Sequence, residues 1–358
     1  MSISPDLLKL LSTEIDFFRK TTQALIKRHG GMTLAEDVHV IGPHDKEGDS
    51  EKPYPFATSA IIHGNEIAGL ASLNAFCEFL LSEEVRLSMP IVIFLGNVKA
   101  AYAGVRSLDS DLNRNFGRPP KPGDHESQRV QDLKKVLAKV RYYFDLHQTI
   151  GPCPKGFFIF SHTDKCYHFA RGALPRQDMV TYWDGIYTTE GMCSDQYVNA
   201  LGGVAITLEL GALGGFQPWQ VSLGFLGVLS AYRYVRYLQK HGHVPHWHQD
   251  ERLCGQLGTI YTWQKVVPYP SNETVVPLLT SANFSFLKAG TPVAMVDGKP
   301  LLLDVSGYQL FASYYNTLKD NGHKPHELLR ILKVVSHEEF SYIQPPPPAV
   351  TTAGSQAS

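Results

Sequence analysis

The sequence lacks the features that mark membrane proteins and nucleic-acid-binding proteins. No stretch reaches the length of a membrane span, about 18 uninterrupted apolar residues, and the N-terminus lacks the basic-then-apolar order of a signal peptide. The 33 basic residues are balanced by 34 acidic residues, and neither half of the chain has a long basic run. Neither nucleic acid nor a membrane is therefore an expected partner. We expect a soluble, cytoplasmic protein, and a homo-oligomer is compatible with the sequence.

Cysteine is scarce and shows no metal-binding pattern. The five cysteines are odd in number, widely spaced and without a Cys-x-x-Cys pair. This argues against a disulfide framework and against a thiolate zinc site, so we expect buried or half-buried free thiols. The five are Cys77, Cys153, Cys166, Cys193 and Cys254.

Apolar runs alternate with helix-like segments over the first two thirds of the chain. The 358 residues, 43% of them hydrophobic, can bury a sizeable core. This alternation predicts an α/β fold, with a mixed, mostly parallel sheet flanked by helices. The predicted strands cover residues 37–41, 56–62, 91–96, 142–147, 156–161 and 204–210. The predicted helices cover residues 1–30, 67–81, 126–139 and 219–238.

The character of the sequence changes near residue 245. Short β-like runs with turn signals follow, such as residues 293–296 and 301–303 on either side of Asp297-Gly298. We interpret the histidine-rich stretch at residues 241–250 as a solvated linker rather than a metal-binding tract. The predicted organisation is a first domain over residues 1–245, a smaller β-rich C-terminal domain over 246–344 and a disordered proline-rich tail over 345–358.

A histidine and a glutamate three residues apart follow directly on the predicted strand at residues 56–62. His63 and Glu66 lie at a strand-to-helix turn, where ligands bind in open α/β sheets. A catalytic zinc takes three protein ligands and keeps its fourth position open, and His147, at the end of another strand, offers the third. Asp145 lies on the same face and is placed to orient a ligand. Together they predict one zinc ion per chain. The alternatives are a helix-capping pair and a hydrogen-bonded core histidine.

Charged side chains at two further strand ends suit a carboxylate-bearing substrate. Arg106 and Arg114 follow the predicted strand at residues 91–96, and a guanidinium presents a planar fork of donors that matches a carboxylate. Surface salt bridges are the alternative for both arginines. Glu209 stands inside an otherwise apolar strand. A buried glutamate is costly unless it is paired, coordinated or functional, so Glu209 is a candidate functional residue.

The motifs, taken in order, resemble the succinylglutamate desuccinylase and aspartoacylase branch of the zinc carboxypeptidase superfamily over roughly residues 55–235. They are His63-Gly64-Asn65-Glu66, Arg106, Asp111-Leu112-Asn113-Arg114-Asn115-Phe116, Asp145-Leu146-His147 and Leu208-Glu209-Leu210-Gly211. The resemblance implies a zinc-carboxypeptidase-like catalytic domain over residues 1–245. It also implies that His63, Glu66 and His147 bind zinc and that Glu209 is the general base.

The resemblance further implies how a substrate is held. Arg106 matches the arginine that polarises the scissile carbonyl, and Asn113 and Arg114 match the pair that binds a substrate carboxylate. The chain departs from the pattern in having Val98 where proline is common, and in having no arginine over residues 194–203 to bind the amino-acid end of the substrate. Replacements for that arginine are Arg171 and Arg176, and candidates for the usual C-terminal tyrosine contact are Tyr261, Tyr269, Tyr308, Tyr314 and Tyr315.

Three functions are compatible with these residues. The first is a zinc-dependent amidohydrolase that removes an acyl group from an N-acyl amino acid or a similar small amide carrying a carboxylate. The second is a metallocarboxypeptidase that acts on peptides with the same zinc, base and arginines. The third, a non-catalytic metal- or metabolite-binding protein, does not need a buried base at Glu209. The sequence favours the amidohydrolase.

Overall fold

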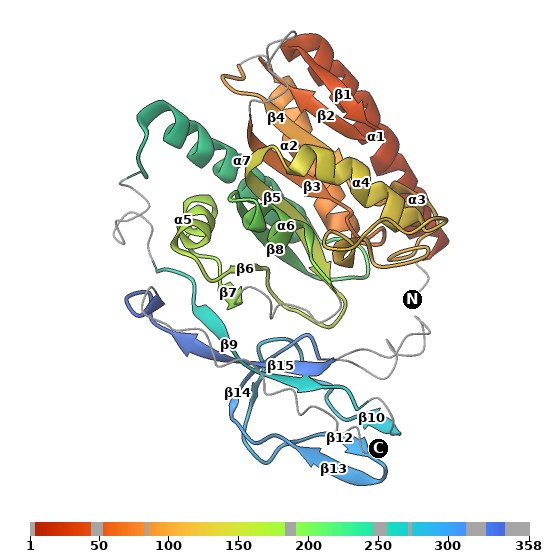
Figure 1. Cartoon of the computed structure of the whole chain (residues 1–358), viewed down its shortest axis with the longest axis vertical. Helices are drawn as coiled ribbons and strands as arrows, with labels where there is room; N and C mark the ends of the chain where they lie inside the picture. Colours follow the sequence, from red (N-terminus) through yellow and green to blue (C-terminus); the bar gives the residue numbers. More distant parts are fainter. Residues whose placement is uncertain are drawn as a thin grey trace, which may run out of the picture.

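A mixed β-sheet flanked by helices forms the larger part of the protein and continues into a smaller β-rich region at the C-terminal end (Figure 1). The structure is a computed structural model that describes residues 4–43, 53–82, 86–182, 191–245, 256–270, 274–312 and 327–340. The predicted α/β fold class is confirmed. None of the helices in the described ranges combines the length and apolar content that a membrane crossing needs.

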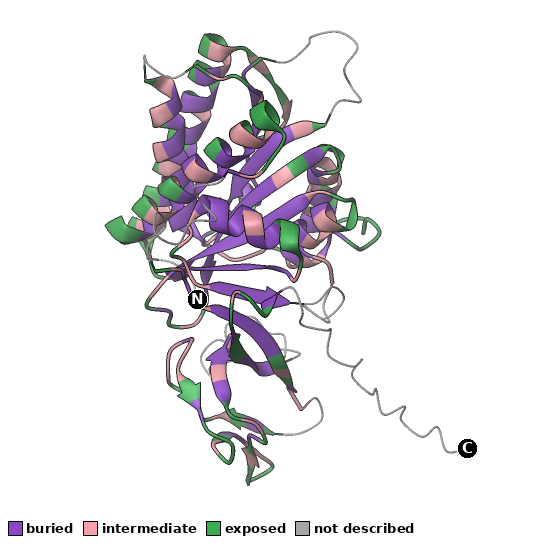
Figure 2. Cartoon of the chain, turned by 90° about the vertical axis from the view of Figure 1, so that its left-hand side faces the viewer, coloured by how far each residue is buried: buried purple, intermediate pink, exposed green. Residues whose placement is uncertain are grey.

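Four parallel strands form the centre of the sheet, in the order β4-β3-β5-β8. They are β3 (Tyr54–Ala60), β4 (Ile91–Leu95), β5 (Val140–Thr149) and β8 (Val204–Ala212). Their side chains are buried over almost their whole length because helices cover both faces (Figure 2). The strands that flank this centre are β1 (Gly31–Ala35), β2 (Val38–Ile41), β6 (Phe157–Ser161) and β7 (Met179–Tyr182).

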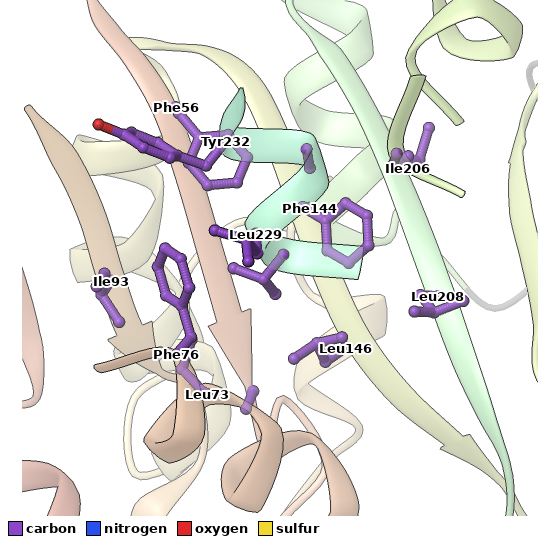
Figure 3. Close-up of a cluster of buried hydrophobic side chains, with 14 of the residues drawn as sticks. Phe56, Leu73, Phe76, Ile93, Phe144, Leu146, Ile206, Leu208, Leu229 and Tyr232 are labelled. Atoms are coloured by element: carbon purple, nitrogen blue, oxygen red, sulfur yellow. The ribbon is translucent and has the colours of Figure 1, made fainter. Parts of the chain in front are cut away.

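One face of the sheet carries a layer of long helices that pack on one another. These are α1 (Pro5–His29), α2 (Ile67–Leu81), α5 (Asp164–Ala173) and α7 (Pro218–His241). Aromatic and aliphatic side chains from this layer and from the central strands form the main core, in which Phe76 and Tyr232 meet Phe56 and Phe144 lies beside Leu229 (Figure 3). A second core lies on the other face, under α4 (His125–Leu137) and α6 (Ser194–Ala200).

The helix boundaries follow local signals in the sequence. The Ser4 hydroxyl accepts a hydrogen bond from the backbone of Leu7, and the positive φ of Gly30 ends α1, as the Ser-Pro start and the Gly-Gly stop predict. The predicted helix over residues 67–81 coincides with α2. The sequence reasoning did not find β1, β7, α3 (Val98–Tyr102), α5, α6 and the short 3₁₀ helix η1 (Leu112–Arg114), which are brief or weakly periodic.

The C-terminal strands extend the main sheet. Strand β9 (Ile260–Pro268) pairs in parallel with β7, and β15 (Glu327–Val335), β14 (Gly307–Leu310) and β11 (Phe286–Leu287) follow it. A separate three-stranded sheet contains β10 (Val275–Pro277), β12 (Pro292–Val296) and β13 (Lys299–Leu302). The predicted hairpin is confirmed, since Asp297 and Gly298, both with positive φ, connect β12 to β13.

Several expectations lie partly or wholly outside the described residues. They include the linker at residues 241–250, of which only 241–245 are described, the proline-rich tail at residues 345–358, and Cys254. The other four cysteines are buried free thiols, as predicted. The division into domains at residue 245 stays a prediction, and the pairing of β7 with β9 joins the two proposed parts through a single sheet.

Candidate active site

The candidate metal ligands lie at the ends of neighbouring parallel strands. His63 and Glu66 lie in the turn between β3 and α2, and His147 lies near the end of β5. The turn packs tightly against α3, because a Cβ atom added at Gly64 would lie 2.4 Å from the backbone nitrogen of Ala101. Only glycine fits this approach. Glu66 is the residue before the first turn of α2 but makes no side-chain capping bond, so the capping alternative does not describe its role.

The three predicted ligands form a compact, buried group. The Nδ1 atom of His63 lies 2.7 Å from Oε1 of Glu66, and the Nδ1 atom of His147 lies 3.0 Å from Oε2 of the same carboxylate. All three side chains are buried, and their ligand atoms lie within 4.8 Å of one another. Burial raises the pKa of Glu66, but the charges of the two histidines outweigh it, so the net effect holds this pKa well below the usual range.

Each histidine turns its second ring nitrogen to an aspartate. Nε2 of His147 lies 2.9 Å from Oδ2 of Asp145, and Nε2 of His63 lies 3.1 Å from Oδ1 of Asp111. The Asp145 carboxylate also accepts hydrogen bonds from the hydroxyls of Ser59 and Ser194. Aspartates in these positions fix the histidine tautomer and leave Nδ1 free to bind a cation.

The donor set fits a divalent transition metal. Two imidazole nitrogens and one carboxylate, buried and converging, match the ligands of catalytic zinc sites, which leave a further position for water. A second acidic group, Asp109, Asp124 and Glu126, is different in kind. The Glu126 carboxylate accepts bonds from the backbone nitrogens of residues 108–110 and from the amide of Asn97. These carboxylates brace the loop that leads to Asp111.

Glu209 lies beside the candidate metal ligand His147. It is the direct strand partner of His147 across the β5–β8 pair, so both side chains lie on the same face of the sheet. Within the described residues, its Oε2 atom is buried and has no hydrogen-bond partner. Burial, partly offset by the charges of His147 and Arg106, raises the pKa of Glu209 to about 8. A carboxyl group tuned in this way suits general acid–base chemistry near neutral pH.

Arg106 reaches the same group from the turn after α3. Its guanidinium lies 2.6 Å from Nε2 of His63, contacts Oε1 of Glu66 at 3.3 Å and pairs with the Asp111 carboxylate at 3.1 Å. Asp111 thus holds both a histidine ligand and the arginine, and it also caps η1 through the backbone of Asn113. The sequence motif contains Asp111, but sequence reasoning assigned it no role because the contacts come from three separate turns.

The predicted carboxylate-binding pair lies next to this group, against the start of α6. The Asn113 side chain accepts a bond from the backbone of Ser194 at 2.9 Å. The Arg114 guanidinium donates to the Asn113 carbonyl at 3.0 Å and to the Cys193 thiol at 3.3 Å. Its charge also acts on Asp111. The structure therefore brings both members of the pair close to the candidate metal ligands.

The remaining sequence candidates lie on α5, in the segment after α5 and in the C-terminal region. Arg171 is buried on α5, where it donates to the Tyr167 hydroxyl at 3.0 Å, and Arg176 lines a cavity of about 470 Å³ with Asp178 and the backbone of residues 256–259. Tyr261 and Tyr308 pack against each other in the C-terminal region, and Tyr269 packs in a separate C-terminal core. Tyr314 and Tyr315 lie outside the described residues.

Comparison with known proteins agrees with this geometry. The succinylglutamate desuccinylase/aspartoacylase catalytic domain matches residues 56–235. The succinylglutamate desuccinylase of Serratia proteamaculans is 40% identical over 101 residues, which cover 26% of this chain and 31% of that protein. The succinylglutamate desuccinylase of Pseudomonas paraeruginosa is 32% identical over 202 residues, which cover 53% of this chain and 58% of that protein. The alignments thus span less than two thirds of these relatives.

Solved structures share the fold over most of the chain. The succinylglutamate desuccinylase of Vibrio cholerae superposes with a TM-score of 0.62 at 16% identity, covering 84% of this chain and 86% of that one. Murine aminoacylase 3 superposes with a TM-score of 0.57 at 19% identity, covering 80% and 96%. With a catalytic-domain match over half of its length and the ordered motifs in place, this chain belongs to the succinylglutamate desuccinylase/aspartoacylase family.

Proposed function

We propose that the protein is a zinc-dependent amidohydrolase that removes the acyl group from an N-acyl amino acid or a similar small amide bearing a carboxylate. The observation that carries the proposal is the position of Glu209, a buried carboxyl without a protein partner among the described residues, directly across the strand pair from the ligand His147. A protein that only binds metal has no need of such a group. Cytoplasmic location and one zinc per chain are part of the proposal.

Each residue of the site has a separate role in the proposed hydrolysis. A cation held by His63, Glu66 and His147 supplies Lewis acidity that makes water nucleophilic near pH 7. Glu209 takes a proton from the attacking water as its oxygen bonds to the amide carbon, and gives that proton to the nitrogen as the carbon–nitrogen bond breaks. Arg106 stabilises the negative charge that develops on the carbonyl oxygen.

Asn113 and Arg114 complete the site by holding the carboxylate of the substrate. The charge of Arg114 acts on the Asp111 carboxylate, which also pairs with Arg106 and contacts His63. A substrate carboxylate bound by Asn113 and Arg114 would hold the amide next to the candidate metal ligands. Because the substrate is already oriented on binding, the reaction step no longer carries the entropy cost of orienting it. The products are a free carboxylic acid and an amino acid.

The proposal is tested by separating metal binding from catalysis. His63→Ala and His147→Ala should lose zinc, measured by elemental analysis of purified protein, whereas His162→Ala, which alters a histidine bonded to Thr181 and Phe340, should keep it. Glu209→Gln should keep zinc and lose about 100-fold or more in hydrolysis of N-acyl amino acids. Full zinc content in both ligand variants, or near-normal turnover in Glu209→Gln, would refute the proposal.

A further inference from the structure

Two phenylalanines of the C-terminal region pack on Phe157, the residue that pairs with Glu209 in the sheet. Phe157, the first residue of β6, is the direct strand partner of Glu209, so the two side chains lie side by side on one face. The ring of Phe284 packs edge-on against the Phe157 ring at 4.9 Å, and the ring of Phe311 lies at 6.3 Å. We name Phe157, Phe284 and Phe311 the aromatic wall.

Both C-terminal members of the wall have unusual backbone conformations. Phe284 has φ 69° and Phe311 has φ 52°, a region that bulky L-residues rarely adopt and that costs free energy. Such strain persists where the surrounding structure enforces it, and it concentrates at functional sites. Phe284 and Phe311 are partly exposed, whereas Phe157 is fully buried. The two C-terminal residues of the wall are therefore the ones that a ligand can contact.

Hydrogen bonds hold the two strained residues together and fix them to the catalytic part. The backbone of Phe311 donates to the side-chain oxygen of Asn283 at 2.9 Å, and the backbone of Phe284 donates to the Gln309 carbonyl at 2.8 Å. The backbone of Asn283 donates in turn to the carbonyl of Pro152, in the loop after β5, at 2.9 Å. The wall is therefore anchored to the loop that follows the ligand His147.

Among the described residues, two cations lie over rings of the wall, and each forms an ion pair with a carboxylate. The Lys155 ammonium lies 4.4 Å from the centre of the Phe284 ring and pairs with Asp178. The Arg330 guanidinium lies 5.6 Å from the centre of the Phe311 ring and pairs with Glu327 at 2.5 Å. A second substrate carboxylate placed here would meet apolar rings and cations that already have partners, which is unfavourable.

From this geometry we infer that the aromatic wall selects the substrate, and that the preferred substrates are N-acyl derivatives of amino acids with aliphatic or aromatic side chains. The inference rests on the proposed function. Glu209 delivers its proton to the leaving amine, so the amine side of the substrate faces Glu209 and the Phe157 ring beside it. Arg114 takes the α-carboxylate, and the side chain of the amino acid packs on Phe284 and Phe311.

The test compares kcat/KM of the zinc-loaded protein for N-acetyl-leucine and N-acetyl-phenylalanine with that for N-acetyl-aspartate and N-succinyl-glutamate. The apolar substrates should be preferred by about 10-fold or more, the scale of discrimination of a hydrophobic pocket. Phe284→Gly and Phe311→Gly remove the rings and suit the positive φ values. Each should lower kcat/KM for the apolar substrates by about 10-fold and change that for N-acetyl-aspartate little.

Phe286→Gly is the matched control, because Phe286 is 54% exposed and packs on Tyr308; it should leave the preference unchanged. Preference for the acidic substrates in the unaltered protein would overturn the role of the wall and leave the proposed function standing. The unaltered protein alone gives this result, whether or not the variants fold. Hydrolysis of none of the four substrates would overturn the proposed function, and the inference with it.

Discussion

At the level of single residues, burial and nearby charges set the pKa values of the carboxyl groups. Glu209 and Asp195 are both buried carboxyls, and burial raises the pKa of each, to about 8 and about 6. Glu66 is buried as well, yet the two adjacent histidines lower its pKa. The same residue type therefore suits metal binding or proton transfer according to the charges around it.

The raised pKa of Asp195 predicts that the unfolding free energy of the protein depends on pH. Its pKa is about 6 in the folded protein because it is buried, while the Tyr182 hydroxyl donates to it at 2.7 Å; in an unfolded chain an aspartate titrates near 4. Because the folded protein holds the Asp195 proton more tightly than the unfolded chain does, protonation stabilises the folded state. This contribution to the unfolding free energy is fully present below pH 4 and is lost as the pH rises through 6. Relative to the unaltered protein, Asp195→Asn should therefore gain up to about 3 kcal/mol in unfolding free energy between pH 4 and pH 7.

Urea unfolding of both proteins at several pH values checks this expectation. Asp132→Asn, at a half-exposed position on α4, controls for the general effect of the exchange. A difference between Asp195→Asn and the unaltered protein that stays constant from pH 4 to pH 7 would contradict the assignment.

At the level of elements, the turn between β3 and α2 positions two of the three candidate metal ligands, His63 and Glu66. The turn packs so closely on α3 that a Cβ atom at Gly64 would lie 2.4 Å from the Ala101 nitrogen, 2.5 Å from the Ala100 carbonyl carbon and 2.7 Å from the Val105 oxygen. These neighbours are backbone atoms, which cannot rotate away. The position of His63 and Glu66 therefore depends on the contact between two short segments.

Gly64→Ala should both destabilise the protein and displace the ligands. We expect a loss of about 3 kcal/mol in unfolding free energy, the upper part of the range for overpacking, together with weaker zinc binding. Gly69→Ala, on the next part of the same segment, meets the Leu146 Cβ atom at 3.0 Å and should cost less. Equal unfolding midpoints and equal zinc affinity for Gly64→Ala and the unaltered protein would show that the turn can relax.

At the level of the whole molecule, the C-terminal strands complete the main sheet. Strand β7 is buried at all four positions and has β9 as its outer neighbour. Tyr182 of β7 also packs against Trp263 of β9, with ring centres 5.8 Å apart. Without the C-terminal region, β7 would become an exposed apolar edge strand, which pairs readily with other chains.

A chain that ends at residue 245 should therefore aggregate, although the sequence predicts a domain boundary there. Size-exclusion chromatography with light scattering, compared with the full chain at the same concentration, measures this directly. A monodisperse fragment that unfolds cooperatively would show that residues 1–245 fold on their own.

Much of the site could be predicted from the sequence because its parts are local. His63 and Glu66 share one turn, and the apolar runs that carry His147 and Glu209 are long enough to identify strands without any partner. The bounds of α2 follow from its apolar periodicity, and the start and end of α1 follow from Ser4, Pro5 and Gly30. Such signals act within a few residues, so the longer elements of the first part of the chain, the candidate ligands and the candidate base could be predicted from the sequence.

Only the tertiary structure decided which distant segments meet. Asp111 contacts both Arg106 and His63. Phe284 and Phe311 pack on Phe157, the strand partner of Glu209, and β9 pairs with β7. Strand β6 runs antiparallel to β8, and this places Phe157 next to the base. No local pattern encodes these pairings, since they depend on strand order and on packing between segments that lie far apart in the chain. The sequence therefore determined which candidate residues are available, and the tertiary structure decided which of them meet and what surrounds them.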